Sequence, residues 1–232
     1  MKIDPCNGIF SDHYFLKWIR MGTFIKNIEK KSMQDFLQQL YEQFLLTSPL
    51  EWLATITGFL CVYLAAKQNI WNWPISIISV LTYLYIFNHN KLYGDSVLQI
   101  YFLGTAIYGW YYWNKRAHSE ERPISSFNNK QMLMTIGSIA VLSAILGLVL
   151  DRFTDTDVPY ADGFCTATSF VAQFLMTRKV LQNWLLWVFV DICYIPLYFH
   201  KDLILTAVLY LAFAIIAWNG YRDWKKTYQN FQ

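Results

Sequence analysis

Charged side chains are scarce in this sequence, which argues against a soluble protein. Asp, Glu, Lys and Arg make up only 15% of its 232 residues, whereas a soluble domain carries about 25%. They are absent altogether from 52–66, 69–90, 96–114, 131–150, 163–177, 180–190 and 203–221. Most of these stretches approach the roughly 20 apolar residues that span a hydrocarbon core. The sequence therefore predicts an all-α membrane protein with about seven transmembrane helices.

Recognisable catalytic motifs are also lacking. No HExxH, GxSxG, Walker A or dinucleotide-binding fingerprint occurs. The histidines lie near span ends or in loops, at His13, His89, His118 and His200. We therefore expect no catalytic residue, no metal and no cofactor, and we expect any transport to be passive or ion-coupled rather than driven by ATP hydrolysis.

The cysteines and the basic residues argue against a cysteine-based functional site and against a nucleic-acid-binding surface. The four cysteines show no CxxC spacing, and Cys61, Cys165 and Cys193 fall inside predicted spans, where they are best explained as small packing residues. The net charge of +3 is scattered over the chain rather than gathered into a phosphate-tracking stripe. Nucleic acid is therefore not an expected partner.

The predicted spans place the charges asymmetrically. They run over 50–66, 70–88, 94–114, 131–150, 162–177, 180–199 and 203–221. One side of the membrane then receives Lys67, Lys115, Arg116, Arg122, Lys130, Arg178, Lys179, Arg222, Lys225 and Lys226, and the other receives Lys91, Arg152 and Lys201. The positive-inside rule predicts a cytoplasmic C-terminus. Residues 1–49 carry interspersed charges and are predicted to form an interfacial or partner-packing amphipathic segment.

An internal repeat is the most informative feature. Sliding the chain by 111 residues places Asn72-Trp73 on Asn183-Trp184, and it pairs further residues: Tyr83 with Tyr194, His89 with His200, Gly109 with Gly220 and Trp113 with Trp224. Two three-helix units, 50–115 and 162–226, then flank a connecting helix at 131–150. The connecting helix makes the units parallel, an architecture typical of transporters whose solute site lies between the units. A duplicated receptor or scaffold is the alternative.

Two tryptophans and an acid form the leading candidate site. Trp184, Trp187 and Asp191 are spaced i, i+3 and i+7 and so share one face of the sixth span. A carboxylate inside a span is a functional-site hypothesis by default. Two indoles beside a carboxylate suit a flat, cationic aromatic ligand through stacking, cation–π attraction and charge pairing.

The first unit and the fifth span offer polar partners for such a ligand. Trp73, Thr82, Tyr83 and Gln99 are candidates to hydrogen-bond sugar hydroxyls, with Asn72 as a further polar group. Gln173 is the preferred pathway residue of a polar run in the fifth span. Each of these residues has packing as its alternative role.

Several of these residues carry a resemblance to a known family. Thr177-Arg178-Lys179, followed by Asn183-Trp184-Leu185-Leu186-Trp187 and Asp191 in the sixth span, resembles the PnuC family of vitamin transporters. The stretch 107–110 (Ile-Tyr-Gly-Trp) and the pair Asn219-Gly220 also resemble that family, and the similarity runs from about Leu50 to Lys226. Asp191 stands where many nicotinamide riboside transporters of the family carry Asn.

The resemblance implies a fold and a function. It implies a 3+1+3 helix fold similar to that of SWEET transporters, assembled as a homotrimer in the bacterial inner membrane. It implies inward facilitated diffusion of nicotinamide riboside, trapped by cytoplasmic phosphorylation. The expected substrate-binding residues, from motif and resemblance together, are Trp184, Trp187, Asp191, Asn183, Trp73, Asn72, Thr82, Tyr83, Gln99, Gln173 and Tyr194.

Other functions stay open at this point. Thiamine also pairs a cationic ring with polar groups, so a thiamine transporter of the same fold is an alternative. Riboflavin is larger and uncharged, and an acidic pocket suits it less. A membrane sensor or scaffold that binds the ligand without moving it is the alternative from another class. An intramembrane hydrolase or transferase using Asp162 and Asp191 is the least favoured.

Overall fold

The protein is helical throughout the part of the chain that the structure, a computed structural model, describes. That part comprises residues 33–89, 93–117, 124–154 and 156–231. Its helices are α2 (Met33–Leu46), α3 (Pro49–Ala66), α4 (Asn72–His89), α5 (Tyr93–Ala117), α6 (Asn129–Phe153), α7 (Pro159–Thr177), α8 (Asn183–His200) and α9 (Ile204–Asn230). The predicted all-α class is confirmed. Residues 1–32 of the predicted N-terminal segment, together with Lys91, His118 and Arg122, lie outside the described residues.

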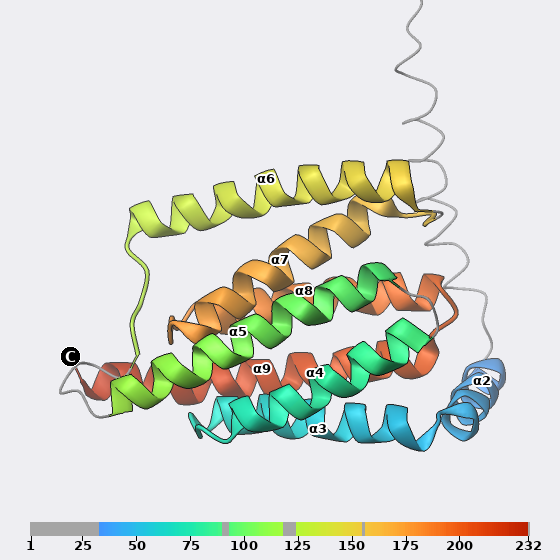
Figure 1. The fold of residues 1–232 in the computed structure, drawn as a ribbon, viewed down its shortest axis with the longest axis horizontal. Coiled ribbons are helices and arrows are strands. Elements are labelled where there is room, and N and C mark those ends of the chain that lie inside the picture. The colour runs from blue at the N-terminus through green and yellow to red at the C-terminus, as the bar shows by residue number, and fades with distance from the viewer. Residues whose placement is uncertain (1–32, 90–92, 118–123, 155, 232) are drawn as a thin grey trace, which may run out of the picture.

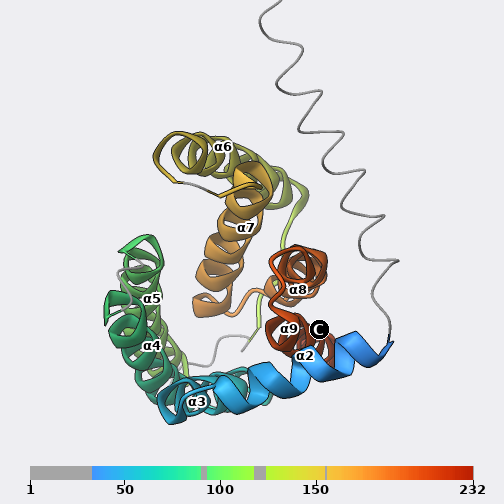
Figure 2. The same ribbon diagram turned by 90° about the vertical axis from the view of Figure 1, so that its right-hand side faces the viewer.

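Helices α3 to α9 run side by side, and α2 lies across one end of the bundle (Figures 1 and 2). The start of α3 is set by Ser48 and Glu51, whose side chains and backbone N–H groups form a reciprocal capping box. Asn128 and Gln131 form the same motif at the start of α6. The starts of α3 and α6 are therefore specified by the local sequence.

The sides of the bundle are apolar. In the described chain, α3, α6 and α9 are each long and apolar enough to cross a membrane. Large apolar side chains point outward from several helices, for example Ile107 on α5, Leu133 on α6 and Ile215 on α9. Exposed apolar surface on this scale suits hydrocarbon rather than water. The protein is therefore a multi-pass membrane protein.

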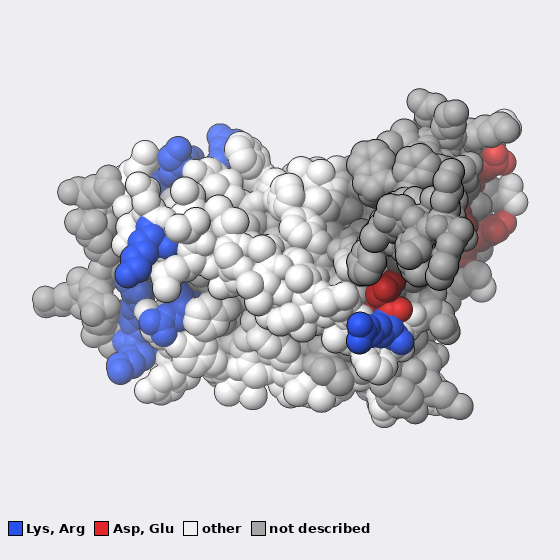
Figure 3. Space-filling model, turned by 90° about the horizontal axis from the view of Figure 1, so that it is seen from above, with Lys and Arg blue, Asp and Glu red and all other residues white. Residues whose placement is uncertain are grey.

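Basic residues gather at one end of the bundle. Lys115 and Arg116 lie in the last turn of α5, Lys130 in the first turn of α6, and Arg178 directly after α7. Figure 3 shows several lysine and arginine side chains at this end, whereas the other end shows acidic residues with a smaller basic patch beside them. We call the two ends the basic end and the opposite end.

The opposite end is held together by polar contacts. The Gln43 side chain of α2 donates to the carbonyl of Asp202 (2.6 Å) and accepts from the Leu205 N–H (2.9 Å). Lys201 Nζ lies 2.9 Å from the Asp162 carboxylate at the start of α7. These contacts fix α2 and α7 to the turn between α8 and α9.

The 111-residue offset of the sequence reappears in local structure. Helices α4 and α8 begin at Asn72 and Asn183, and each asparagine Nδ2 donates to a carbonyl three residues earlier (2.7 and 2.6 Å). The turns before these helices contain Gln68 and Lys179, which both adopt left-handed backbone conformations (φ 56° and 54°). Matched polar side chains thus build matched turns at the basic end.

Candidate functional site

The 111-residue offset relates helices α3–α5 to helices α7–α9, and these two sequence repeats meet along two lines of contact, α3 with α9 and α5 with α7. We call these lines the α3–α9 seam and the α5–α7 seam. In the α3–α9 seam, the rings of Phe59 and Phe213 stack with centroids 4.3 Å apart. In the α5–α7 seam, the Tyr101 hydroxyl donates to the Phe170 carbonyl (2.8 Å). The seams are therefore packed by aromatic side chains, in the region where a solute path between the repeats would run.

A cluster of four tryptophans fills the space between the repeats near the basic end. It consists of Trp73 on α4, Trp113 on α5, Trp184 on α8 and Trp224 on α9, none of which is more than 2% exposed. Ring centroids lie 5.2 Å apart for Trp73–Trp113, 5.8 Å for Trp113–Trp224 and 5.5 Å for Trp184–Trp224. We call these four residues the tryptophan cluster.

Two glycines allow the outer tryptophans to approach the helices. A Cβ at Gly109 would lie 2.4 Å from Trp73 Cη2, and a Cβ at Gly220 would lie 2.9 Å from Trp184 Cδ2. Such distances are shorter than any real contact of a Cβ atom. Glycine is therefore required at both positions if the tryptophans are to pack as they do.

Hydrogen bonds tie the cluster across both seams. Trp113 Nε1 donates to the Met176 carbonyl at the end of α7 (3.3 Å), and Trp224 Nε1 donates to the Ala65 carbonyl at the end of α3 (3.1 Å). These bonds are equivalent under the 111-residue offset. Together with the cluster they close the basic end between the two repeats.

The two remaining tryptophans of the cluster keep unused donors. Trp73 Nε1 and Trp184 Nε1 are buried and have no hydrogen-bond partner among the described residues. The acceptor Asn183 Oδ1 is also buried and has no hydrogen-bond partner among the described residues. Buried polar groups usually have a hydrogen-bond partner. The unpaired indole donors occupy positions that are equivalent under the 111-residue offset, which indicates that their hydrogen-bond partners change between states of the protein.

The acid predicted from sequence lies further along α8. Asp191 is 4% exposed, and its carboxylate is close enough to interact electrostatically with Tyr210 on α9. Trp187, one turn earlier on α8, is partly buried and packs against the core that contains the tryptophan cluster. Tyr194, one turn later, interacts with Thr166 and Ser169 on α7 and packs on Tyr210 with ring centroids 4.6 Å apart.

The predicted residues of the first unit are spread along α4 and α5. The Tyr83 hydroxyl is 3.2 Å from Thr55 Oγ1 on α3, whereas Thr82 donates to the Ile78 carbonyl of its own helix (2.8 Å). Gln99 is buried on α5. The structure records no bond between these residues and Asp191.

Gln173 lies at the junction of the repeats. Its Nε2 is 3.5 Å from Thr105 Oγ1 on α5, so it spans the α5–α7 seam. The structure therefore brings together Asn72, Trp73, Asn183 and Trp184 at the basic end, and Trp187, Asp191 and Tyr194 along α8, and it leaves Thr82, Tyr83, Gln99 and Gln173 on other elements.

Three residues of these groups were not predicted as site residues. Trp113 and Trp224 complete the tryptophan cluster, and their coincidence under the 111-residue offset was the signal that pointed to them. Tyr210 lies within electrostatic reach of Asp191, and no motif marks it. Tyrosine in an apolar span is usually a packing residue, so only the tertiary structure reveals this proximity.

The arrangement suits binding and passage of a cation rather than covalent chemistry. A carboxylate buried in an apolar span is costly unless a positive or hydrogen-bonding group comes to it. The aromatic rings of Trp187 on α8 and Tyr210 on α9 provide faces for stacking and cation–π attraction. The tryptophan cluster separates this carboxylate from the basic end.

Comparison with known proteins was informative over most of the chain. Residues 48–226 match the family described as nicotinamide mononucleotide transporter. The nicotinamide riboside transporter PnuC of Escherichia coli K12 is 27% identical over 201 residues, which cover 75% of this chain and 84% of that protein. The PnuC of Neisseria mucosa is 29% identical over 198 residues, covering 77% of this chain and 74% of that protein.

Two further matches bear on the substrate and on the fold. The riboflavin/roseoflavin transporter RibM of Streptomyces davaonensis is 24% identical over 190 residues, covering 80% of this chain and 87% of that protein. A crystal structure of the vitamin B3 transporter PnuC superposes with a TM-score of 0.64 at 28% identity, covering 85% of this chain and 91% of that chain.

Proposed function

The chain belongs to the nicotinamide mononucleotide transporter family, and from this premise we propose that it carries nicotinamide riboside into the cell across a bacterial plasma membrane. It is a transporter and not an enzyme. The relatives named as PnuC transport nicotinamide riboside, and they align with most of this chain.

The observation that carries the substrate proposal is the buried carboxylate of Asp191. The nicotinamide ring of the riboside is flat and cationic, so it gains charge pairing from Asp191 and stacking from Trp187. Tyr194, Gln173, Gln99, Thr82 and Tyr83 are proposed to meet the ribose hydroxyls. Trp73, Trp184, Asn72 and Asn183 are proposed to contact the substrate as it leaves, since unpaired polar groups of both repeats lie there.

The fold proposed for this function has two parallel three-helix units, 50–115 and 162–226, joined by the helix at 131–150. The matched asparagine-capped turns and the equivalent tryptophan hydrogen bonds support a structural repeat. We also propose the SWEET-like 3+1+3 arrangement and the homotrimer that the family resemblance implies, with residues 1–49 as a separate amphipathic segment.

The proposed mechanism follows from the closed basic end. We place this end in the cytoplasm because basic residues collect there. Release of the substrate then requires the Trp113 and Trp224 hydrogen bonds across the seams to break. The movement is proposed to be facilitated diffusion, and phosphorylation in the cytoplasm keeps the riboside inside.

Uptake into proteoliposomes tests the proposal. Purified protein should give saturable uptake of labelled nicotinamide riboside. Asp191→Ala and Trp187→Ala should each raise the half-saturating concentration by about tenfold or more, because a charge-assisted contact or a cation–π contact is lost. Ile192→Ala is the matched control on α8, since Ile192 is 54% exposed on the outer surface. Unchanged uptake in Asp191→Ala would contradict the assignment of Asp191 to the substrate site.

Competition distinguishes the substrates. Unlabelled nicotinamide riboside should compete, whereas riboflavin should not, despite the similarity to RibM. Competition by thiamine alone would make the protein a thiamine transporter with the same site. Asp191→Asn separates charge from hydrogen bonding, because asparagine retains a hydrogen-bonding carbonyl. Tight binding without any uptake would instead indicate a sensor or scaffold.

A further inference from the structure

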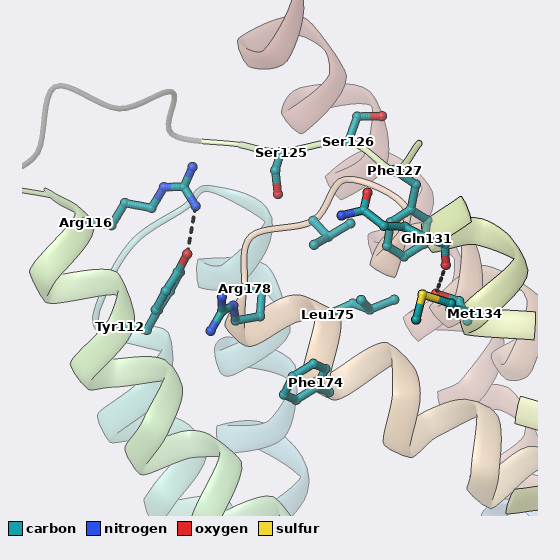
Figure 4. A pocket seen from close by; sticks show the side chains of 12 residues that line it. Tyr112, Arg116, Ser125, Ser126, Phe127, Gln131, Met134, Phe174, Leu175 and Arg178 are labelled. Atoms are coloured by element: carbon teal, nitrogen blue, oxygen red, sulfur yellow. Dashed lines mark hydrogen bonds between the residues drawn. The ribbon is translucent and has the colours of Figure 1, made fainter. Parts of the chain in front are cut away.

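A crevice of about 340 Å³ opens at the basic end, at the α5–α7 seam. It is bounded by the end of α5, the segment 124–128, the start of α6 and the end of α7 (Figure 4). Its lining residues are Tyr112, Arg116, Ser125, Ser126, Phe127, Gln131, Met134, Thr135, Phe174, Leu175, Arg178 and Val180. None of these residues belongs to the proposed substrate site.

The internal repeat provides a direct comparison for the charge of this crevice. At the α3–α9 seam, Lys67 Nζ lies 2.7 Å from the Asp223 carboxylate. The equivalent residues of the α5–α7 seam are Arg178 and Tyr112. Arg178 contacts only neutral partners, the Tyr108 hydroxyl at 2.5 Å and the Tyr112 ring at 4.7 Å, and forms no ion pair with a described residue. Among the described residues, the repeat thus supplies a carboxylate at the α3–α9 seam and none at the α5–α7 seam.

Further positive charge surrounds Arg178. Arg116 lines the same crevice and donates to the Tyr112 hydroxyl (3.0 Å). Lys179 follows directly, with Nζ 4.3 Å from the centre of the Trp113 ring. Its pKa is lowered to about 8, first by burial and then by the charge of Arg116. A site with this local field favours an anion.

The wall of the crevice is held in place. The Ser125 N–H donates to the Lys179 carbonyl (3.0 Å), and the Leu181 N–H donates to the Ser125 carbonyl (2.8 Å). Gln182 accepts from the Phe127 N–H (3.1 Å) and donates to Ser126 Oγ (2.8 Å). Ser125 and Ser126 are therefore held by hydrogen bonds to the segment that follows α7. Figure 4 shows the Ser125 side chain directed toward the space between Arg116 and Arg178, and the Ser126 side chain directed away from them.

The remaining lining is apolar and leads outward along the bundle. Met134 on α6 is 62% exposed and Phe174 on α7 is 50% exposed. Both belong to the apolar sides of helices that face hydrocarbon. A free phosphate would leave this surface unused, whereas an acyl chain would cover it.

We propose that this crevice binds an anionic phospholipid, with its phosphate at Arg178 and Arg116 and an acyl chain along Phe174 and Met134. Basic pockets between helices at a membrane surface recognise such headgroups, and each Arg or Lys contributes to the attraction. The lipid supplies at the α5–α7 seam the negative charge that Asp223 supplies at the α3–α9 seam.

Native mass spectrometry of the full chain, equilibrated in detergent with equal amounts of phosphatidylglycerol and phosphatidylcholine, tests this assignment. The wild type should retain phosphatidylglycerol preferentially. Arg178→Gln and Arg116→Gln should each lower the phosphatidylglycerol-to-phosphatidylcholine ratio about fivefold. Lys225→Gln is the matched control, because it removes an exposed charge from α9 at the same end. Only variants with wild-type helix content and a single elution peak are compared.

Four results would overturn the proposal. Arg178→Gln and Arg116→Gln with the wild-type ratio would show that the arginines do not select the lipid. An equal loss in Lys225→Gln would reduce the preference to general surface charge. Displacement of the lipid by millimolar glycerol 3-phosphate or inorganic phosphate would mean that a free anion suffices, and a changed oligomeric mass with an unchanged lipid ratio would make the crevice an interface between copies.

Discussion

Single residues decide how closely the helices of each unit pack. Gly109 and Gly220 lie under Trp73 and Trp184, where any Cβ would collide with an indole ring. Because these tryptophans are completely enclosed, a collision cannot be relieved by a small side-chain rotation. The glycines are therefore needed for space, not for backbone conformation.

Gly109→Ala and Gly220→Ala should each destabilise the protein by about 1–3 kcal/mol, the usual range for overpacking. Gly104→Ala is the matched control on α5, since its Cβ would meet no atom within 4 Å, and it should be neutral or gain up to about 1 kcal/mol of helix propensity. Unfolding in detergent, followed by circular dichroism, measures both. Equal loss in Gly104→Ala would show that tight contact with tryptophan is not the cause.

Lys179 makes stability depend on pH. Its folded-state pKa of about 8 lies below the ordinary value of 10.5, so the unfolded chain binds more protons between these values. Stability should therefore rise as pH increases from about 8 to 10.5 and be lowest below pH 8. Lys179→Met should flatten this rise, whereas the exposed Lys225→Met should leave it unchanged. A wild-type unfolding curve that falls over this window would contradict the assignment.

At the level of elements, helix ends at the basic end are joined by indole hydrogen bonds rather than by strong ion pairs. The Lys67–Asp223 pair is exposed, and exposed pairs contribute little. The Trp113 and Trp224 bonds are buried and reach the Met176 and Ala65 carbonyls, which also accept the backbone N–H groups of Lys179 and Gln68. These indole bonds are therefore buried polar links across the seams at the basic end.

Trp113→Phe and Trp224→Phe should each lower stability by about 1 kcal/mol, because a buried indole–carbonyl hydrogen bond is lost. Since the two rings contact each other, the double variant should deviate from additivity by about 0.5 kcal/mol or more. Trp110→Phe and Trp218→Phe are matched controls, being 43% and 49% exposed on α5 and α9. Unfolding titrations with denaturing detergent measure the cycle, and strict additivity would speak against a shared cluster.

At the scale of the whole molecule, the proposed transport requires the two proposed repeats to move relative to each other. The seams are narrow, and the α3–α9 seam is bridged at its middle by Phe59 and Phe213. A covalent link at this point should hold the repeats together while leaving each one intact.

In a chain whose four cysteines are replaced by serine, Phe59→Cys with Phe213→Cys should lose uptake when a short bifunctional thiol reagent joins them. Uptake should return on reduction if the reagent is cleavable. The comparison pair, Tyr194→Cys with Tyr210→Cys, links α8 to α9 within one repeat. Its uptake should already be reduced without the reagent, because the substrate site is altered. Only the Phe59/Phe213 pair should therefore lose uptake when the reagent is added. Unchanged uptake in the linked Phe59/Phe213 pair would rule out rocking at this seam.

Local sequence was sufficient to locate most helices, because a membrane span is recognised from the length of its uncharged stretch and from the capping and charged residues at its ends. The prediction of a span over 50–66 corresponds to α3 at Pro49–Ala66, where the capping box is local. The span predicted over 180–199 begins later, at Asn183, because Val180 and Leu181 belong to a turn that pairs with Ser125. That pairing joins residues 55 positions apart, and no local pattern encodes it.

The sequence by itself determined the helical class, the apolar spans, the basic end and the repeat, because each depends on the spacing and polarity of residues along one chain. It also singled out Asp191, since a carboxylate in an apolar span is visible without coordinates. The tertiary structure alone decided that Trp113 and Trp224 meet across the repeats, each with a second tryptophan packed on it. It also decided that Tyr210 lies within electrostatic reach of Asp191, and that Arg178 faces Tyr112 where Lys67 faces a carboxylate. These are contacts between distant segments, and they depend on how the helices cross and not on their composition.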